Sequence, residues 1–141
     1  MSTATGITLE CIIVTPERSV LDEPTNFVAL PMFDGELGVL PGRAPLIGRL
    51  GYGELRIGQG QAARLYYIDG GFVQVRNNVV TVLTPQARKA EDIKPDAVAQ
   101  ALQAALAPAP TAEGQEGRSK DQERARAQLR VARRAGGRDE Y

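Results

Sequence analysis

The sequence predicts a β-sandwich followed by an α-helical hairpin, and its composition divides the chain in the same way. Residues 1–85 contain eleven of the fifteen glycines, whereas residues 86–141 contain fourteen of the nineteen alanines. No aromatic residue lies between Val73 and Glu140. Because aromatic and β-branched residues favour strands and alanine favours helices, we place a β domain at 1–85 and a helical hairpin at 86–141.

The β domain is expected to contain short strands that are separated by turn signals. The expected strands are 7–14, 20–21, 26–31, 53–57, 62–68, 72–76 and 79–83. Asn77-Asn78 suits a type I′ hairpin, because asparagine tolerates positive φ. Asp69-Gly70-Gly71 is expected to end the strand that precedes it. Several strands are apolar on both faces, which favours two packed sheets over one sheet open to water.

The segment Asp34–Gly51 has the densest set of backbone constraints in the chain. It holds five glycines and two prolines, and we interpret it as a rigid loop whose glycines permit positive φ. Pro41-Gly42 suits the two central positions of a type II turn. The loop would carry Glu36, Arg43 and Arg49 outward. It is either a rigid connection between strands or a rigid loop that docks on a partner.

The helical region is expected to begin with a turn or two of helix at 85–90. Apolar residues at helical spacing then predict a helix over 95–107, a mobile Pro/Gly/Ala-rich linker over 107–117 and a second helix over 119–135. The second helix has a thin apolar stripe of Ala125, Leu129 and Ala132, with Val131 to one side. Little apolar surface would therefore hold it to a core.

Charge is divided unevenly between the two helices, although the whole chain is neutral. Residues 118–141 hold eight basic residues against four acidic ones, a net charge of +4, and residues 90–117 hold one basic residue against five acidic ones, a net charge of −4. The helices either pair their opposite charges or form a hairpin that releases a basic helix toward an acidic groove elsewhere. The two alternatives are compatible if the closed hairpin pairs its charges and the open hairpin releases the basic helix.

Composition also argues against several functions. The chain has no histidine and only one cysteine, Cys11, which is expected in the core, so no Ser-His-Asp or Cys-His mechanism and no cysteine zinc site can be built. No metal or cofactor is expected. An acid-base enzyme using Asp34, Glu36 and Asp69 lacks any supporting cluster, and a nucleic-acid binder would need aromatic residues beside its basic tail. No apolar run or secretory signal is present, which fits a reduced, cytoplasmic setting.

Three stretches of the chain resemble a known family. They are Gly35–Leu46 (GELGVLPGRAPL), Tyr67–Val75 (YIDGGFVQV) and Arg124–Val131 (RARAQLRV). Each resembles a segment of the epsilon subunit of bacterial-type rotary ATP synthases, and the likeness covers nearly the whole chain in the same order. Composition alone favours a stand-alone β-sandwich protein-binding module with a mobile basic helical tail, and the resemblance favours the rotor subunit.

The resemblance implies an N-terminal two-sheet sandwich of about ten strands and a C-terminal helical hairpin. It implies a non-catalytic central-stalk subunit of a proton-translocating ATP synthase, peripheral at the cytoplasmic face of the bacterial plasma membrane. The sandwich would couple the gamma shaft to the c-ring, with membrane contact only through the complex. The hairpin would fold back on the sandwich or extend to the alpha and beta subunits and inhibit ATP hydrolysis. No nucleic acid is expected as a partner.

The resemblance also implies roles for particular residues. It assigns Glu36 to the surface that faces the c-ring, Arg43 to the surface that faces gamma, and Thr15 to one of these interfaces. It assigns a regulatory role to the basic residues of the last helix: Arg124, Arg126, Arg130, Arg133 and Arg134. Some family members bind ATP through an acid and an arginine at the first helix, where this chain has Lys94 and Ala97, so we expect weak or no ATP binding.

Overall fold

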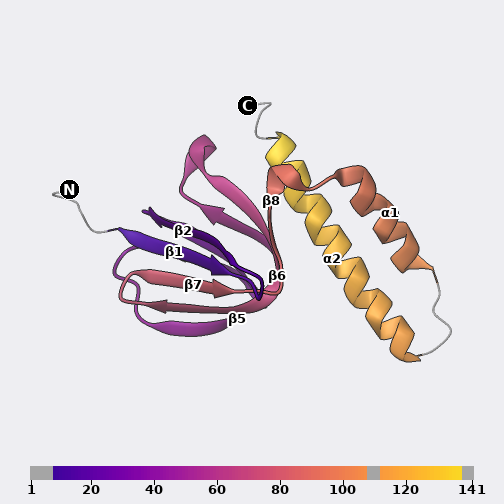
Figure 1. Cartoon of the computed structure of the whole chain (residues 1–141), viewed down its shortest axis with the longest axis horizontal. Helices are drawn as coiled ribbons and strands as arrows, with labels where there is room; N and C mark the ends of the chain where they lie inside the picture. Colours follow the sequence, from indigo (N-terminus) through magenta and orange to yellow (C-terminus); the bar gives the residue numbers. More distant parts are fainter. Residues whose placement is uncertain (1–7, 108–111, 138–141) are drawn as a thin grey trace.

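Eight strands form a β-sandwich in the computed structural model, which describes residues 8–107 and 112–137 (Figure 1). The strands are β1 (Leu9–Val14), β2 (Ser19–Thr25), β3 (Val28–Met32), β4 (Gly35–Val39), β5 (Leu46–Ile57), β6 (Arg64–Arg76), β7 (Val79–Leu83) and β8 (Ala87–Lys89). The expectations at residue 7 and at 108–111 lie outside the described residues. The predicted fold class, a β-sandwich followed by two helices, is confirmed.

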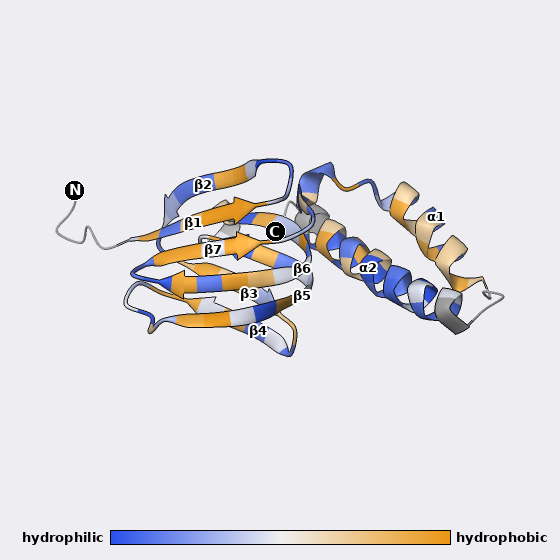
Figure 2. Ribbon diagram, turned by 60° about the horizontal axis from the view of Figure 1, so that its bottom comes forward, coloured by the Kyte–Doolittle hydropathy of each residue, from blue (hydrophilic) through white to orange (hydrophobic). Residues whose placement is uncertain are grey.

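The strands belong to one sheet that folds into two layers. Their order is β2-β1-β7-β6-β5-β3-β4, and β8 pairs with β6. The first layer contains β2, β1, β7 and the adjoining halves of β6 and β5, and the second contains the other halves of β5 and β6 with β3, β4 and β8 (Figure 2). The two long strands serve in both layers, and the described residues form eight strands, where the resemblance implied about ten.

The two long strands turn opposite faces to the core in the two layers. In β6, Tyr66 and Ile68 are buried in the sandwich core in the first half, and Val73 and Val75 take that place in the second. The change of face occurs at Gly70-Gly71, whose φ angles are 77° and 107°. The prediction that Asp69-Gly70-Gly71 ends the strand is therefore wrong, because the glycines redirect a continuous strand.

The expected rigid loop over 34–51 is instead β4, a turn and the first half of β5. Most of its glycines allow close packing and do not adopt positive φ. A Cβ at position 48 would lie 2.4 Å from Met32 Cε, and a Cβ at position 38 would lie 3.1 Å from the Phe27 ring. Glycine in these strands therefore makes room for the side chains of the neighbouring strand, a role that local sequence does not reveal.

Two predicted turns are confirmed by their backbone geometry. Arg43 N donates to Leu40 O across Pro41-Gly42 at 3.2 Å, and Gly42 has φ 88°, as a type II turn requires. Asn77 and Asn78 have φ 51° and 64°, which is the pattern of a type I′ hairpin. The Asn78 side chain also accepts a hydrogen bond of 2.7 Å from Gly42 N, so the two turns support each other.

Two antiparallel α-helices follow the sandwich (Figure 1). They are α1 (Pro95–Leu106) and α2 (Ala112–Gly137). The predicted helix at 85–90 is wrong, because β8 adds to the sheet there and a 3₁₀ turn, η2 (Ala90–Asp92), follows it. The predicted start of the second helix at 119 is also wrong. The helix already begins at Ala112, and near the predicted start it is joined to the end of α1, since Arg118 donates to Ala104 O at 2.7 Å and Gln122 to Ala105 O at 2.9 Å.

We predict that Gly71→Ala destabilises the sandwich by about 3 kcal/mol or more, because a left-handed residue with a Cβ costs about 1–2 kcal/mol and the displaced carbonyl adds a similar cost. The new Cβ would lie 2.0 Å from Leu83 O. Gly42→Ala is the matched control, since Gly42 has positive φ but no atom within 4 Å of its Cβ position. Urea denaturation measures both variants, and equal losses would contradict the packing argument.

Candidate functional site

The first half of β6 is buried on both faces, and α2 covers the face that does not point into the sandwich core. Leu65 and Tyr67 of β6 form a second cluster with Ala127 and Val131 of α2. Val131 is only 2% exposed, so it lies at the centre of the contact and not to one side, as the sequence suggested. We call this contact the α2 interface. It holds the helical hairpin against the sandwich.

Asp69 is the polar centre of the α2 interface. Its carboxylate accepts a hydrogen bond of 2.7 Å from Tyr67 Oη and pairs with Arg124 Nε at 3.2 Å. The Arg124 guanidinium also lies over the Tyr52 ring, 5.3 Å from its centroid. We call these four residues the Asp69 cluster. It joins the turn of β6 to the middle of α2.

The surroundings of the Asp69 cluster shift the pKa values of two members. Burial holds the pKa of Tyr67 well above its usual range, and the hydrogen bond and charge of Asp69 act in the same direction. Burial alone would lower the pKa of Arg124, but the Asp69 carboxylate and the neighbouring tyrosines outweigh it, so the pKa of Arg124 is raised. The Tyr67 phenol is therefore neutral and the Arg124 guanidinium is charged, and both contact the Asp69 carboxylate.

A second series of charges joins α2 to β5 and β4 in the second layer of the sandwich. Arg134 Nε lies 3.3 Å from Glu54 Oε2, and Glu54 Oε1 lies 3.4 Å from Arg56 Nη1. Arg56 in turn lies 3.8 Å from Glu36. Glu36, assigned by resemblance to a partner contact, is thus connected to the basic helix through alternating charges.

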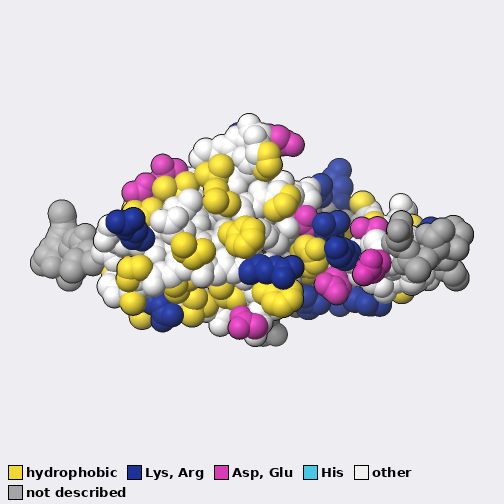
Figure 3. Space-filling view, turned by 90° about the horizontal axis from the view of Figure 1, so that it is seen from below, with side chains coloured by type: hydrophobic (Ala, Val, Ile, Leu, Met, Phe, Trp, Pro, Cys, Tyr) yellow, Lys and Arg dark blue, Asp and Glu magenta, His cyan; other side chains and the backbone are white. Residues whose placement is uncertain are grey.

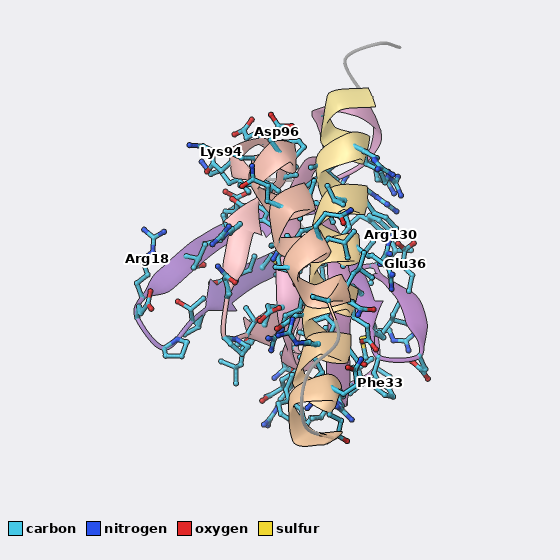
Figure 4. The ribbon with its side chains drawn as sticks, turned by 90° about the vertical axis from the view of Figure 1, so that its right-hand side faces the viewer. Arg18, Phe33, Glu36, Lys94, Asp96 and Arg130 are labelled. Carbon is cyan, nitrogen blue, oxygen red and sulfur yellow. The ribbon has the colours of Figure 1, made fainter. Side chains whose placement is uncertain are left out.

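The structure does not bring Thr15, Glu36 and Arg43 together. Glu36 lies on β4 beside the β3–β4 turn, and Arg43 follows the turn at the other end of β4. Thr15 is buried, and its hydroxyl donates to Arg18 O at 3.2 Å within its own turn. Figure 4 shows Glu36 and Arg18 on opposite sides of the molecule. Their partner contacts stay predictions.

The five basic residues of α2 to which the resemblance assigns a regulatory role occupy different positions. Arg124 and Arg134 hold the helix to the sandwich through Asp69 and Glu54. Arg126, Arg130 and Arg133 are exposed. The regulatory role of these residues stays a prediction, as does weak or no ATP binding at the α1 start, where Lys94 and Ala97 are exposed.

An exposed apolar patch lies on the outer face of the first layer and extends onto the β3–β4 turn, where Phe33 lies beside Arg49 of β5, and sequence reasoning did not single it out. Four large side chains there are exposed by half or more: Phe33 at 63%, Ile47 at 79%, Phe72 at 58% and Leu83 at 51%. Phe72 and Leu83 are paired across β6 and β7. Figure 3 shows this face, with Lys and Arg side chains beside the hydrophobic ones where the sheet meets the helices. Exposed apolar surface of this kind marks interaction sites.

The signal that could have revealed the patch was the set of strands that are apolar on both faces. We interpreted that pattern as two packed sheets. The pattern has two causes in the structure. In the first half of β6, the face that points away from the sandwich core is covered by α2, and in the second half, where Phe72 lies, that face is open. Sequence alone cannot separate a covered outer face from an open one.

None of the described residues forms a group of three or more potential metal ligands, and none of the described helices has the length and hydrophobicity needed to cross a membrane. Cys11 is in the core, as expected, and burial raises the pKa of its thiol to about 12. The fold and its surfaces define a class of protein, a β-sandwich with an exposed apolar face and a docked arm of two helices.

Comparisons with known proteins identify the family. Residues 8–90 match the family model described as "ATP synthase, Delta/Epsilon chain, beta-sandwich domain". The ATP synthase epsilon chain of Rhodopirellula baltica is 48% identical over 128 residues, 90% of this chain and 100% of that protein. The epsilon chain of a Synechococcus species is 36% identical over 129 residues, 89% of this chain and 94% of that protein.

A solved structure supports the same assignment. A chain of the Euglena gracilis mitochondrial ATP synthase, in a structure of OSCP, F1 and c-ring, superposes with a TM-score of 0.78 at 25% identity, covering 86% of this chain and 79% of that one. The chain belongs to the family of ATP synthase epsilon chains, which are non-catalytic subunits of the enzyme complex.

We predict that Asp69→Asn loosens α2 without unfolding the sandwich. Losing the charge opposite Arg124 should cost about 1–2 kcal/mol of docking free energy, which raises amide exchange in α2 by roughly five- to thirtyfold. Hydrogen exchange read at residues 124–134 measures the effect. Asp121→Asn is the control, because Asp121 pairs with the same Arg124 at 3.6 Å but is 60% exposed. Equal exchange in both variants would contradict the role of Asp69.

Proposed function

We propose that this chain is the central-stalk subunit that couples the gamma shaft to the c-ring of a proton-translocating ATP synthase. The observation that carries the proposal is the exposed apolar patch on a sandwich of this family. The Euglena structure that the chain resembles is an assembly that contains F1 and a c-ring. The complex would place the chain peripherally at the cytoplasmic face of a bacterial plasma membrane, with membrane contact only through the other subunits.

The patch provides the apolar part of the shaft contact, and Arg43 lies at its border. Arg43 is exposed and shortly precedes Ile47 in the chain. This position supports the assignment of Arg43 to the gamma side. Glu36 lies in the other layer, on β4, which suits a separate contact with the ring. Thr15 would act by shaping the turn that presents Arg18, since its hydroxyl is used inside that turn.

We predict that Phe72→Asp weakens binding of the full chain to the isolated gamma subunit by about tenfold or more, because an aromatic anchor at the centre of an interface is replaced by a charge. Titration calorimetry measures the affinity. Leu106→Asp is the matched control, since Leu106 is 46% exposed but lies on α1 and outside the patch. Unchanged affinity of the Phe72 variant would argue against the patch as the shaft contact.

The helical hairpin would act as a regulator with two positions. The docked position is the one with Val131 and the Asp69 cluster in place. In the extended position, the basic side of α2 would meet acidic surfaces of the alpha and beta subunits and inhibit ATP hydrolysis. A helix with five arginines between residues 124 and 134 has the charge that gives the second position its own affinity.

We predict that deleting residues 115–141 raises ATP hydrolysis by the assembled enzyme by about fivefold or more, which is the lower range of typical coupling between sites. Hydrolysis is measured on the purified complex. A variant with glutamine at positions 126, 130, 133 and 134 should also be more active, whereas lysine at the same positions keeps the charge and should preserve inhibition. Unchanged hydrolysis after the deletion would exclude a regulatory arm.

A further inference from the structure

A groove of about 660 Å³ runs between the sandwich and α2. Its sandwich side includes Phe33, Arg49, Tyr52 and the Gly70-Gly71 bend, and its α2 side includes Lys120, Glu123, Arg126 and Arg130. Arg124 and Asp69, already paired with each other, also line it. In Figure 4, Arg130 extends from α2 on the side of the molecule where Phe33 and Glu36 lie. The groove exists only while α2 is docked.

The groove has a surplus of positive charge. Once Asp69 and Arg124 are set aside as a pair, four basic residues remain against Glu123. Among the residues that the structure describes, Arg49, Arg126 and Arg130 have no ion-pair partner. The Arg49 guanidinium lies over the Phe33 ring, 4.2 Å from its centroid, which fixes its position at the mouth of the groove. Such an arrangement attracts carboxylates.

The groove is also continuous with the exposed apolar patch. Phe33 belongs to both surfaces, and Arg49 is paired with Phe72 across β5 and β6. A partner that lies on the patch therefore reaches the groove without a gap. It needs aliphatic side chains for the patch and carboxylates for the arginines.

We propose that the groove binds an acidic segment of the shaft, and that the docked α2 thereby forms part of the shaft contact. The inference rests on the proposed function, because the shaft is the partner that function supplies. Since α2 supplies one wall of the groove, shaft binding and docking of the helix strengthen each other by the same factor. The shaft then favours the docked, non-inhibiting position of the arm.

The test is the affinity of the full chain for the isolated gamma subunit at low salt. The double variant Arg126→Glu with Arg130→Glu should weaken gamma binding about tenfold. Arg49→Glu should also weaken gamma binding, and because Arg49 lies on the sandwich wall of the groove, this effect does not depend on α2. The difference should shrink in 0.5 M salt, because exposed charges are screened. The double variant Lys89→Glu with Lys94→Glu is the matched control, since it reverses two exposed charges that do not line the groove. Its affinity for gamma should stay within about twofold of the wild-type affinity.

A second measurement tests the coupling. Val131→Ser, which weakens the α2 interface without changing the charge of the groove, should weaken gamma binding, and added gamma should slow amide exchange at residues 124–134 of the wild-type chain. Tighter binding of the Val131 variant would overturn the proposal.

Two further outcomes separate this inference from the proposed function. No binding of gamma by the wild-type chain would remove the proposed function itself. Wild-type binding with unchanged affinity of the groove variants would overturn only the groove. Pyrophosphate and ATP are titrated into the wild-type chain and into the Arg126 and Arg130 double variant. If these substitutions abolish binding of either small anion but leave gamma binding intact, the groove is a small-anion site and the proposal is overturned.

Discussion

The burial of the outer face of β6 by α2 is the interaction on which the arrangement of this chain depends. Leu65 and Tyr67 would be exposed without the helix, and each fully buried side chain of this size contributes about 1.5–3 kcal/mol. Asp69 then fixes how the helix lies, because its carboxylate is shared by Tyr67 and Arg124. An arm held in this way leaves the sandwich only when another surface replaces both the apolar cover and the ion pair.

The charges around this contact determine position more than stability. Exposed ion pairs contribute less than about 1 kcal/mol each, and Arg134 and Glu36 are mostly exposed. Their value lies in their order, because Glu36, Arg56, Glu54 and Arg134 alternate in sign from β4 to the helix.

Local sequence predicted those features that local physics decides. The Pro41-Gly42 turn, the Asn77-Asn78 hairpin and the order of a β part before a helical part follow from backbone preferences of single residues, although β8 extends the sheet beyond the predicted boundary at residue 85. The remaining features depend on contacts between distant segments. Gly48 packs beside the end of the Met32 side chain on the neighbouring strand, and Arg118 of α2 donates to Ala104 O of α1. The arginines of the candidate site could be found in the sequence, but not which of them are paired.

The continuity of β5 and β6 has a mechanical consequence. Each strand passes from one layer to the other without interruption, and the two remain hydrogen-bonded to each other on both sides of the bend. A twisting load on one layer is therefore carried to the other through covalent backbone and a ladder of hydrogen bonds, whereas layers held by side-chain packing alone could slide.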